Sequence, residues 1–124
     1  MEIAIIAHDG KKVDMVQFLN KNKKILQQER IQLISTGTTG GKAESIGLKV
    51  TKMLSGPLGG DAQIAGRVAE GKTKMVLFFK DPLSSHAHEA DINMLLRVCD
   101  VHNIPIATNE ATAQLLLNAI AQQS

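Results

Sequence analysis

Aromatic residues are almost absent from this sequence, which has three Phe and neither Trp nor Tyr among its 124 residues. Proteins that bind nucleic acids stack bases on aromatic rings and carry a strong positive charge. Here the formal net charge is only +2. The composition therefore argues against a nucleic-acid partner.

Cysteine and long apolar runs are scarce too. Cys99 is the only cysteine, which excludes an internal disulfide framework and a multi-cysteine metal site. It falls in a predicted helix, where we expect a small core residue rather than a nucleophile. No apolar run approaches the roughly 20 residues that span a bilayer, and residue 2 opens a strand-like segment rather than a basic, cleavable leader. We expect a cytoplasmic protein with no membrane partner.

The remaining composition is that of a globular protein, with 44% apolar and 21% charged residues. A chain of 124 residues can build one substantial core and is too short for two. Residues 1–124 are therefore predicted to form a single domain.

Apolar patterns and Gly or Pro punctuation divide the chain into alternating strands and helices. Strands are predicted at residues 2–7, 31–36, 48–54, 75–79 and 104–108, and helices at 11–28, 42–46, 62–69, 91–102 and 110–121. The most apolar strand, 75–79, is expected at the sheet centre. The last helix is expected to bury Leu115, Leu116 and Ile120. Strands that alternate with helices predict a three-layer α/β/α fold with a mostly parallel five-stranded sheet.

The segment from Ser55 to Asp61 holds three glycines and a proline in seven residues, between a predicted strand and a predicted helix. Backbone N–H groups at such a helix start attract anions. Asp61 would lie on the first helical turn, beside a bound anion. The alternative is that Asp61 only caps the helix and the glycines only form the turn.

Other polar clusters also follow predicted strands, and in a parallel sheet they would share one edge. The stretch Thr36-Gly37-Thr38-Thr39-Gly40 suits a phosphate, although threonine at a helix start is also an ordinary cap. It lacks the spacing of a P-loop and of a dinucleotide fingerprint, which favours a small phosphorylated ligand. Lys12, one turn into the first helix, is a candidate phosphate ligand or else a surface lysine.

The connection over residues 81–91 contains Asp81, His86, His88 and Asp91. No H-E-x-x-H or comparable spacing is present, so acid–base chemistry is favoured over a metal site. We predict no metal ligand among these residues.

These segments together resemble the methylglyoxal synthase family. The matching segments, which run in order over most of the chain, are Ala7-His8-Asp9, Thr36-Gly37-Thr38-Thr39-Gly40, Ser55-Gly56-Pro57-Leu58-Gly59-Gly60-Asp61, Phe78-Phe79-Lys80-Asp81-Pro82-Leu83, Leu95-Leu96-Arg97 and Ile104-Pro105-Ile106-Ala107-Thr108-Asn109. The resemblance implies the methylglyoxal synthase-like fold, a variant of the flavodoxin-like arrangement.

The resemblance also implies an activity: a cofactor-free lyase that converts dihydroxyacetone phosphate to methylglyoxal and inorganic phosphate. It implies a homohexamer that inorganic phosphate inhibits. In the family pattern, Asp61 is the base, His88 binds the substrate oxygens, and Asp81 and Asp91 are accompanying carboxylates. The implied substrate and phosphate contacts are His8, Lys12, Thr36, Gly37, Thr38, Thr39, Ser55 and Gly56. His86 is an additional histidine in the loop, and the spacing to Asp91 favours His88 as the functional one.

Two other functions use the same scaffold features. The fold also serves as a non-catalytic regulatory domain that binds phosphorylated metabolites, as at the end of carbamoyl phosphate synthetase large chains. Such a domain needs the phosphate-holding loops but not the combination of Asp61, Asp81, His88 and Asp91. An isomerase that acts on triose phosphates is a third possibility, which product analysis would distinguish.

Overall fold

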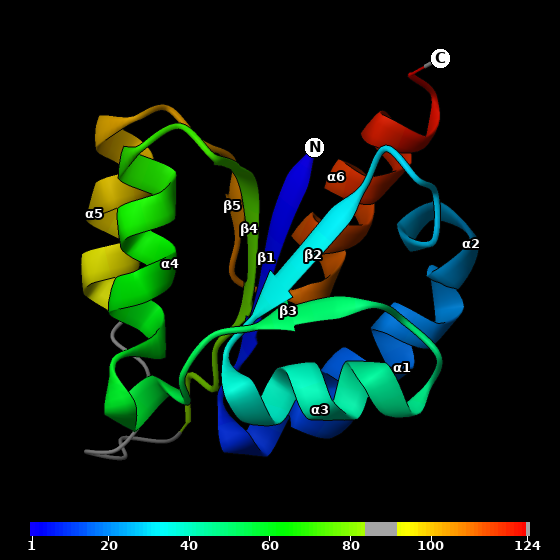
Figure 1. Cartoon of the computed structure of the whole chain (residues 1–124), viewed down its shortest axis with the longest axis horizontal. Helices are drawn as coiled ribbons and strands as arrows, with labels where there is room; N and C mark the ends of the chain where they lie inside the picture. The colour runs from blue at the N-terminus through cyan, green and yellow to red at the C-terminus, as the bar shows by residue number, and fades with distance from the viewer. Residues whose placement is uncertain (84–91, 124) are drawn as a thin grey trace.

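The computed structural model describes residues 1–83 and 92–123. Within these residues five strands form one sheet in the order β3-β2-β1-β4-β5, and all four neighbouring pairs are parallel (Figure 1). The strands are β1 (Glu2–Ala7), β2 (Gln32–Ser35), β3 (Val50–Lys52), β4 (Thr73–Phe79) and β5 (Ile106–Ala107). The predicted α/β class with a parallel five-stranded sheet is confirmed.

Helices cover both faces of the sheet. The helices are α1 (Lys12–Lys21), α2 (Lys23–Leu26), α3 (Gly37–Ser45), α4 (Gly60–Ala69), α5 (Ile92–Val101) and α6 (Glu110–Ala121), with short 3-10 turns η1 (Asp9–Lys11) and η2 (Gly56–Leu58). Figure 1 shows α4 and α5 on one side of the sheet and α1, α2, α3 and α6 on the other. None of the described helices is long and apolar enough to cross a membrane.

The central strand is β1, whereas the sequence predicts that position for residues 75–79. All six residues of β1 are buried, and it pairs with both β2 and β4. Both runs are continuously apolar, so composition cannot rank them. The chain order places β2 and β3 on one side of β1 and β4 and β5 on the other, which makes the gap between β1 and β4 the topological switch point.

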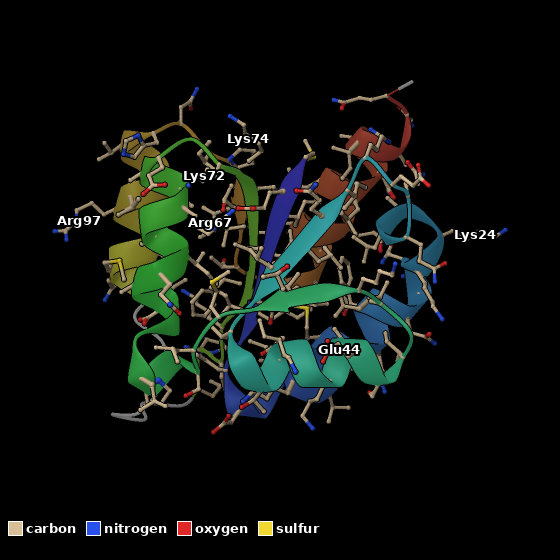
Figure 2. The ribbon with its side chains drawn as sticks, viewed as in Figure 1. Lys24, Glu44, Arg67, Lys72, Lys74 and Arg97 are labelled. Carbon is tan, nitrogen blue, oxygen red and sulfur yellow. The ribbon has the colours of Figure 1, made fainter. Side chains whose placement is uncertain are left out.

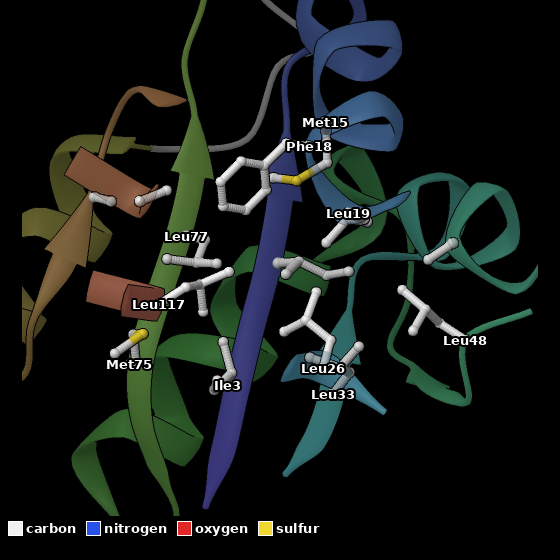
Figure 3. Packing of buried hydrophobic residues seen from close by; sticks show 14 of the residues in the cluster. Ile3, Met15, Phe18, Leu19, Leu26, Leu33, Leu48, Met75, Leu77 and Leu117 are labelled. Atoms are coloured by element: carbon white, nitrogen blue, oxygen red, sulfur yellow. The ribbon is translucent and has the colours of Figure 1, made fainter. Parts of the chain in front are cut away.

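Alternate residues of β1 contribute to two hydrophobic cores, one on each face of the sheet. Ile3 and Ile5 pack with α1, α2, α3 and α6, and Figure 3 shows this cluster from close by. Ala4 and Ile6 pack with α4 and α5 on the other face. Cys99 is fully buried in the second core, and burial raises the pKa of its thiol to about 11. The cysteine is thus a core residue, as the sequence suggests.

The predicted helix over residues 11–28 is interrupted at Asn22, between α1 and α2. Asn22 donates from Nδ2 to the Phe18 carbonyl oxygen and to Gln114 Oε1, each at 2.9 Å. Gln114 Nε2 donates back to Asn22 Oδ1 at 2.8 Å. The amide pair joins α1 to α6, and because its partner lies 92 residues away no local pattern indicates the break.

Residues 37–40 are helical, whereas the sequence predicts a helix only over 42–46. Helix α3 begins at Gly37. The helix ends at Ser45, and Gly47 shortly after it has a φ of 94°, in the left-handed region that commonly follows a helix end.

Close packing explains why glycine stands at position 40 of α3 despite its low helix propensity. A Cβ on Gly40 would lie 2.6 Å from Cγ of Lys52, whereas one on Gly37 would make an ordinary contact, 3.4 Å from the carbonyl oxygen of Met53. The helix therefore approaches the β3 segment more closely than a larger residue would allow without displacing its neighbours. Tertiary packing outweighs the local preference for a turn.

Two further expectations are corrected in detail. The edge strands β3 and β5 are shorter than predicted. On α6, Leu115 is 70% exposed, and the fully buried positions are Ala113 and Leu117. The predicted burial of Ile120 is confirmed.

A polar network closes the amino edge of the sheet. Arg67 donates from Nη2 to Glu2 Oε1 at 2.6 Å and from Nε to Glu2 Oε2 at 2.9 Å, while Thr73 Oγ1 donates to Glu2 Oε2 at 2.6 Å. Figure 2 shows Arg67 between α4 and the sheet, whereas Arg97 of α5 points outward. The network joins β1, α4 and β4.

Arg30 joins the two ends of the described chain at the same edge. The Met1 ammonium donates to the Arg30 carbonyl oxygen at 2.6 Å. The Arg30 guanidinium donates from Nη2 to the Ile120 carbonyl oxygen at 2.6 Å, where it satisfies an acceptor in the last turn of α6. Figure 1 accordingly shows the start of β1 and the end of α6 at one end of the molecule.

Candidate active site

The carboxyl ends of the strands meet at the opposite edge of the sheet, the lower one in Figure 1, where α1, α3 and α4 begin. His8 follows β1, Thr36 follows β2, Ser55 lies shortly after β3, and Asp81 lies just beyond β4. Ligands of open parallel sheets bind at this edge near the switch point. The structure thus brings together the polar clusters that the sequence places after separate strands.

The start of α3 carries two buried threonines, Thr36 and Thr39. Thr36 is the N-cap residue, yet its side chain makes no capping hydrogen bond. Thr39 Oγ1 is buried without a hydrogen-bond partner in the described part of the chain. Thr36 and Thr39 are 5% and 2% exposed, while Thr38 lies at the surface. A buried hydroxyl at the positive end of a helix dipole suits an anion.

The backbone of Leu54 and Ser55 passes between the starts of α3 and α4. The N–H of Gly37 donates to the Leu54 carbonyl oxygen at 3.3 Å, and that of Gly60 donates to the Ser55 carbonyl oxygen at 3.0 Å. A Cβ on Gly60 would collide with the Leu54 carbonyl oxygen, so only glycine fits there. Two helix N-termini therefore converge beside Ser55.

The glycine-rich segment itself forms η2, which starts at Gly56 and includes Pro57 in its first turn. Gly59 has a φ of 103°, a left-handed conformation that favours glycine. This reversal turns the chain directly into α4, as the Gly-rich sequence predicts.

Asp61 lies on the first turn of α4, where the sequence places it. It is only 8% exposed, and its Oδ1 accepts the Ala62 N–H at 3.0 Å. It does not act as the N-cap residue, because Gly59 occupies that position. A carboxylate this far from water is in a suitable setting for a general base.

His8 is held in one tautomer. Its Nδ1 accepts the backbone N–H of Asp81 at 2.9 Å, and its ring packs edge-on against Phe78 with centroids 5.1 Å apart. An acceptor nitrogen carries no proton, so the proton of the neutral ring lies on Nε2. Nε2 is buried and has no partner among the described residues. His8 therefore offers a directed hydrogen-bond donor.

Lys12 points back toward the end of β1 and forms an ion pair with Asp9, with 2.5 Å between Nζ and Oδ1. The lysine side chain is 17% exposed and the aspartate side chain 80%. The ammonium group is thus paired with the exposed carboxylate that follows His8. The role of Lys12 as a phosphate ligand stays a prediction.

Asp81 closes the site on the β4 side. Its Oδ1 accepts the Leu83 N–H at 3.0 Å, and its carboxylate lies so close to Gly10 that a Cβ there would collide with Oδ2. The other predicted loop residues, His86, His88 and Asp91, lie outside the described residues.

Sequence patterns missed one side chain at this edge, Gln63. Its Oε1 accepts the Leu54 N–H at 2.8 Å, which ties α4 to the segment after β3. A glutamine two positions after Asp61 gives no sequence signal of this contact. The contact depends on the crossing of Leu54 between two helices.

Neither of two surface hollows coincides with these residues. One of about 720 Å³ lies over the α2–β2 and α3–β3 connections, where Leu26 and Val50 are among its lining residues. One of about 270 Å³ lies beside β4 and the start of α6, with Lys80 and Asn109 in its lining. Within residues 1–83 and 92–123, no group of three His, Cys, Asp or Glu could hold a metal ion.

Known proteins resemble this chain over most of its length. The family model described as "MGS-like domain" matches residues 14–108. A methylglyoxal synthase of Clostridium botulinum (strain Alaska E43 / Type E3) is 53% identical over 118 residues, which cover 94% of this chain and 98% of that protein. One of Carboxydothermus hydrogenoformans is 52% identical over 121 residues, 97% of this chain and 98% of that protein.

The fold agrees as well. The crystal structure of a methylglyoxal synthase from Elizabethkingia anophelis NUHP1 superimposes with a TM-score of 0.89 at 40% identity, covering 94% of this chain and 76% of that one. Because the family model matches more than half of the chain and the relatives match nearly all of it, the chain belongs to the MGS-like domain family.

Proposed function

We propose that this protein is a lyase that converts dihydroxyacetone phosphate to methylglyoxal and inorganic phosphate without a cofactor, with residues 1–124 acting as one domain. The observation that carries the proposal is the buried Asp61 beside two converging helix N-termini, in a chain 53% identical to a methylglyoxal synthase. A base next to a phosphate site is the minimum that this elimination requires.

The substrate phosphate binds where α3 and α4 converge. Backbone N–H groups and hydroxyls there, together with the Lys12 ammonium, supply charge-assisted hydrogen bonds. The residues that we assign to the substrate and its phosphate are His8, Lys12, Thr36, Gly37, Thr38, Thr39, Ser55 and Gly56. The buried Thr39 hydroxyl supports this assignment, because it has no protein partner in the described residues.

Asp61 takes a proton from the hydroxymethyl carbon of the substrate, and the electrons form an enediolate. The enediolate then expels phosphate from the carbon on the other side of the former carbonyl, which leaves the enol of methylglyoxal. Protonation of the enol carbon and loss of its hydroxyl proton give methylglyoxal. Elimination needs the breaking C–O bond perpendicular to the enediolate plane, so the phosphate site must fix that angle.

Negative charge on the substrate oxygens needs donors that are already in place. The Nε2–H of His8 is such a donor, and its orientation is fixed by the Asp81 N–H. By likeness to the family pattern, we assign His88 to the substrate oxygens and Asp81 and Asp91 to supporting proton transfers.

The test is incubation with dihydroxyacetone phosphate, with methylglyoxal and free phosphate measured together. Equal amounts of both products are expected. Binding without turnover would instead indicate a non-catalytic regulatory domain, and glyceraldehyde 3-phosphate without free phosphate would indicate an isomerase. Either outcome would refute the lyase.

Inorganic phosphate, the product, also fits the substrate phosphate site, so we propose that it inhibits. By family likeness we propose a cytoplasmic homohexamer. Light scattering that reports a monomer at micromolar concentration would refute the hexamer without bearing on the chemistry.

A further inference from the structure

The Leu54–Ser55 backbone carries the contact between α3, α4 and the site. Of its four polar groups, three have partners: the Leu54 carbonyl oxygen accepts from Gly37, and the Ser55 carbonyl oxygen accepts from Leu58 and Gly60. The Leu54 N–H donates to Gln63 Oε1. The Ser55 N–H has no partner among the described residues, so it remains as a donor for a ligand.

Gln63 differs from the other partners of this segment. Those partners are backbone N–H groups of α3, η2 and α4, whereas in the described chain Gln63 is the one side chain that bonds the Leu54–Ser55 backbone. Gln63 also lies on α4, two positions after Asp61, and its own N–H donates to the Gly59 carbonyl oxygen at 3.0 Å. Its side chain therefore connects α4, which carries Asp61, to the segment that carries the Ser55 N–H.

We propose that Gln63 is a positioning residue, which fixes the Ser55 N–H and hydroxyl relative to Asp61 by holding the Leu54 N–H. The inference rests on the proposed function for its catalytic consequence. Without Gln63, the Leu54 N–H would turn toward water and the Ser55 donor would move with it, because the two groups are adjacent in the chain. Phosphate would then bind more weakly, and its C–O bond would be held at a less defined angle.

The decisive variant is Gln63→Met, which keeps the length of the side chain and removes the acceptor. The dissociation constant for inorganic phosphate and the KM for dihydroxyacetone phosphate should each rise about fivefold, the scale of one lost hydrogen bond. The melting temperature should stay near that of the wild type, since Gln63 is exposed. The matched control is Gln17→Met, at an exposed position of α1, which should change neither constant.

Gln63→Glu separates the hydrogen bond from the bulk of the side chain, because a carboxylate also accepts the Leu54 N–H. Its added charge repels phosphate, so both variants should be compared with the wild type at about 1 M salt, where screening is strong. There Gln63→Glu should bind phosphate within about twofold of the wild type while Gln63→Met remains weaker. Equal weakening of both variants would overturn the proposal and leave only a structural role.

Amide hydrogen exchange tests the geometry without relying on activity. The Leu54 N–H should be protected in the wild type and in Gln63→Glu, and should exchange faster in Gln63→Met. Faster exchange with unchanged phosphate binding would refute the positioning role. If the wild type forms no methylglyoxal, the proposed function fails, and the phosphate measurements alone decide on Gln63.

Discussion

At the amino edge of the sheet, the Glu2 carboxylate accepts hydrogen bonds from Arg67 and Thr73, whereas at the carboxyl edge Thr39 Oγ1 and His8 Nε2 are buried without a partner among the described residues. Both edges belong to the same strands and the same two cores. An unsatisfied buried polar group costs roughly 1–3 kcal/mol. The molecule therefore keeps its unmet hydrogen-bonding capacity at one edge, where a ligand can satisfy it.

Among the variants that test this contrast, Asp61→Asn at the carboxyl edge should have the largest effect, a loss of turnover. The amide keeps the oxygen that accepts the Ala62 N–H, so folding should survive, but it cannot accept the substrate proton. Turnover should fall by about 10²–10⁴-fold. Exchange of the hydroxymethyl proton with deuterated solvent, followed by proton NMR, should disappear as well. Exchange at the wild-type rate would show that another group is the base.

Replacing one buried threonine by valine at each edge should shift stability in opposite directions. Thr73→Val removes a hydrogen bond to the Glu2 carboxylate and should lower the free energy of unfolding by about 1.5–3 kcal/mol. Thr39→Val removes a hydroxyl that has no hydrogen-bond partner among residues 1–83 and 92–123, and it should raise the free energy of unfolding by about 1 kcal/mol when phosphate is absent.

Urea unfolding with and without phosphate measures both threonine variants. Phosphate should stabilise the wild type and Thr73→Val more than Thr39→Val, because the stabilisation by a bound ligand grows with the logarithm of its affinity. Destabilisation of both variants without phosphate would show that the two edges do not differ in this way.

The Glu2 network at the amino edge should also make the free energy of unfolding decrease at acidic pH. Hydrogen bonds from Arg67 and then Thr73 hold the pKa of Glu2 below the ordinary glutamate value of 4.5, against the burial that would raise it. The unfolded state binds the proton more readily, so this stabilisation is complete above the ordinary value and is lost as the pH falls through the lowered one. Between about pH 6 and pH 3, the free energy of unfolding should fall more steeply in the wild type than in Glu2→Gln. Parallel curves would exclude Glu2 as the cause.

The smallest effect on stability should come from the removal of an exposed ion pair near the amino edge. Lys72 Nζ and Glu70 Oε2 lie 2.8 Å apart, with more than half of each side chain exposed. Solvent screens such pairs, so Glu70→Gln should leave the urea midpoint unchanged within error. A clear drop in the urea midpoint would show that an exposed ion pair also stabilises the protein. Burial would then not explain the contrast between the edges.

Sequence patterns predicted the features that depend on local chemistry. The glycines at 56 and 59 and the helix that follows fixed Asp61 on a first turn, and the alternation of strands and helices fixed the parallel sheet. The signal for Asp61 lies within one turn of it, and the signal for the sheet is the alternation of short local patterns along the chain. The clustering of His8, Thr36 and Ser55 at one edge followed directly from parallel strands.

What the sequence could not predict depends on distant partners. The break at Asn22 needs Gln114, the start of α3 at Gly37 needs the β3 segment, and the tautomer of His8 needs the Asp81 N–H. The exposure of Leu115 depends on how α6 is rotated against the sheet, which neighbouring leucines leave ambiguous. In each case the deciding contact is tertiary.

Arg30 holds the start of the chain and the last turn of α6 at the edge of the sheet farthest from Asp61. For anyone who immobilises this protein on a sensor surface or fuses it to a carrier, both ends are attachment points that leave the carboxyl edge facing the solution. A fusion at Met1 would replace its ammonium by a neutral amide and weaken the contact with Arg30. The end of α6 is the better anchor, because Arg30 binds a main-chain oxygen there that an added segment would leave in place.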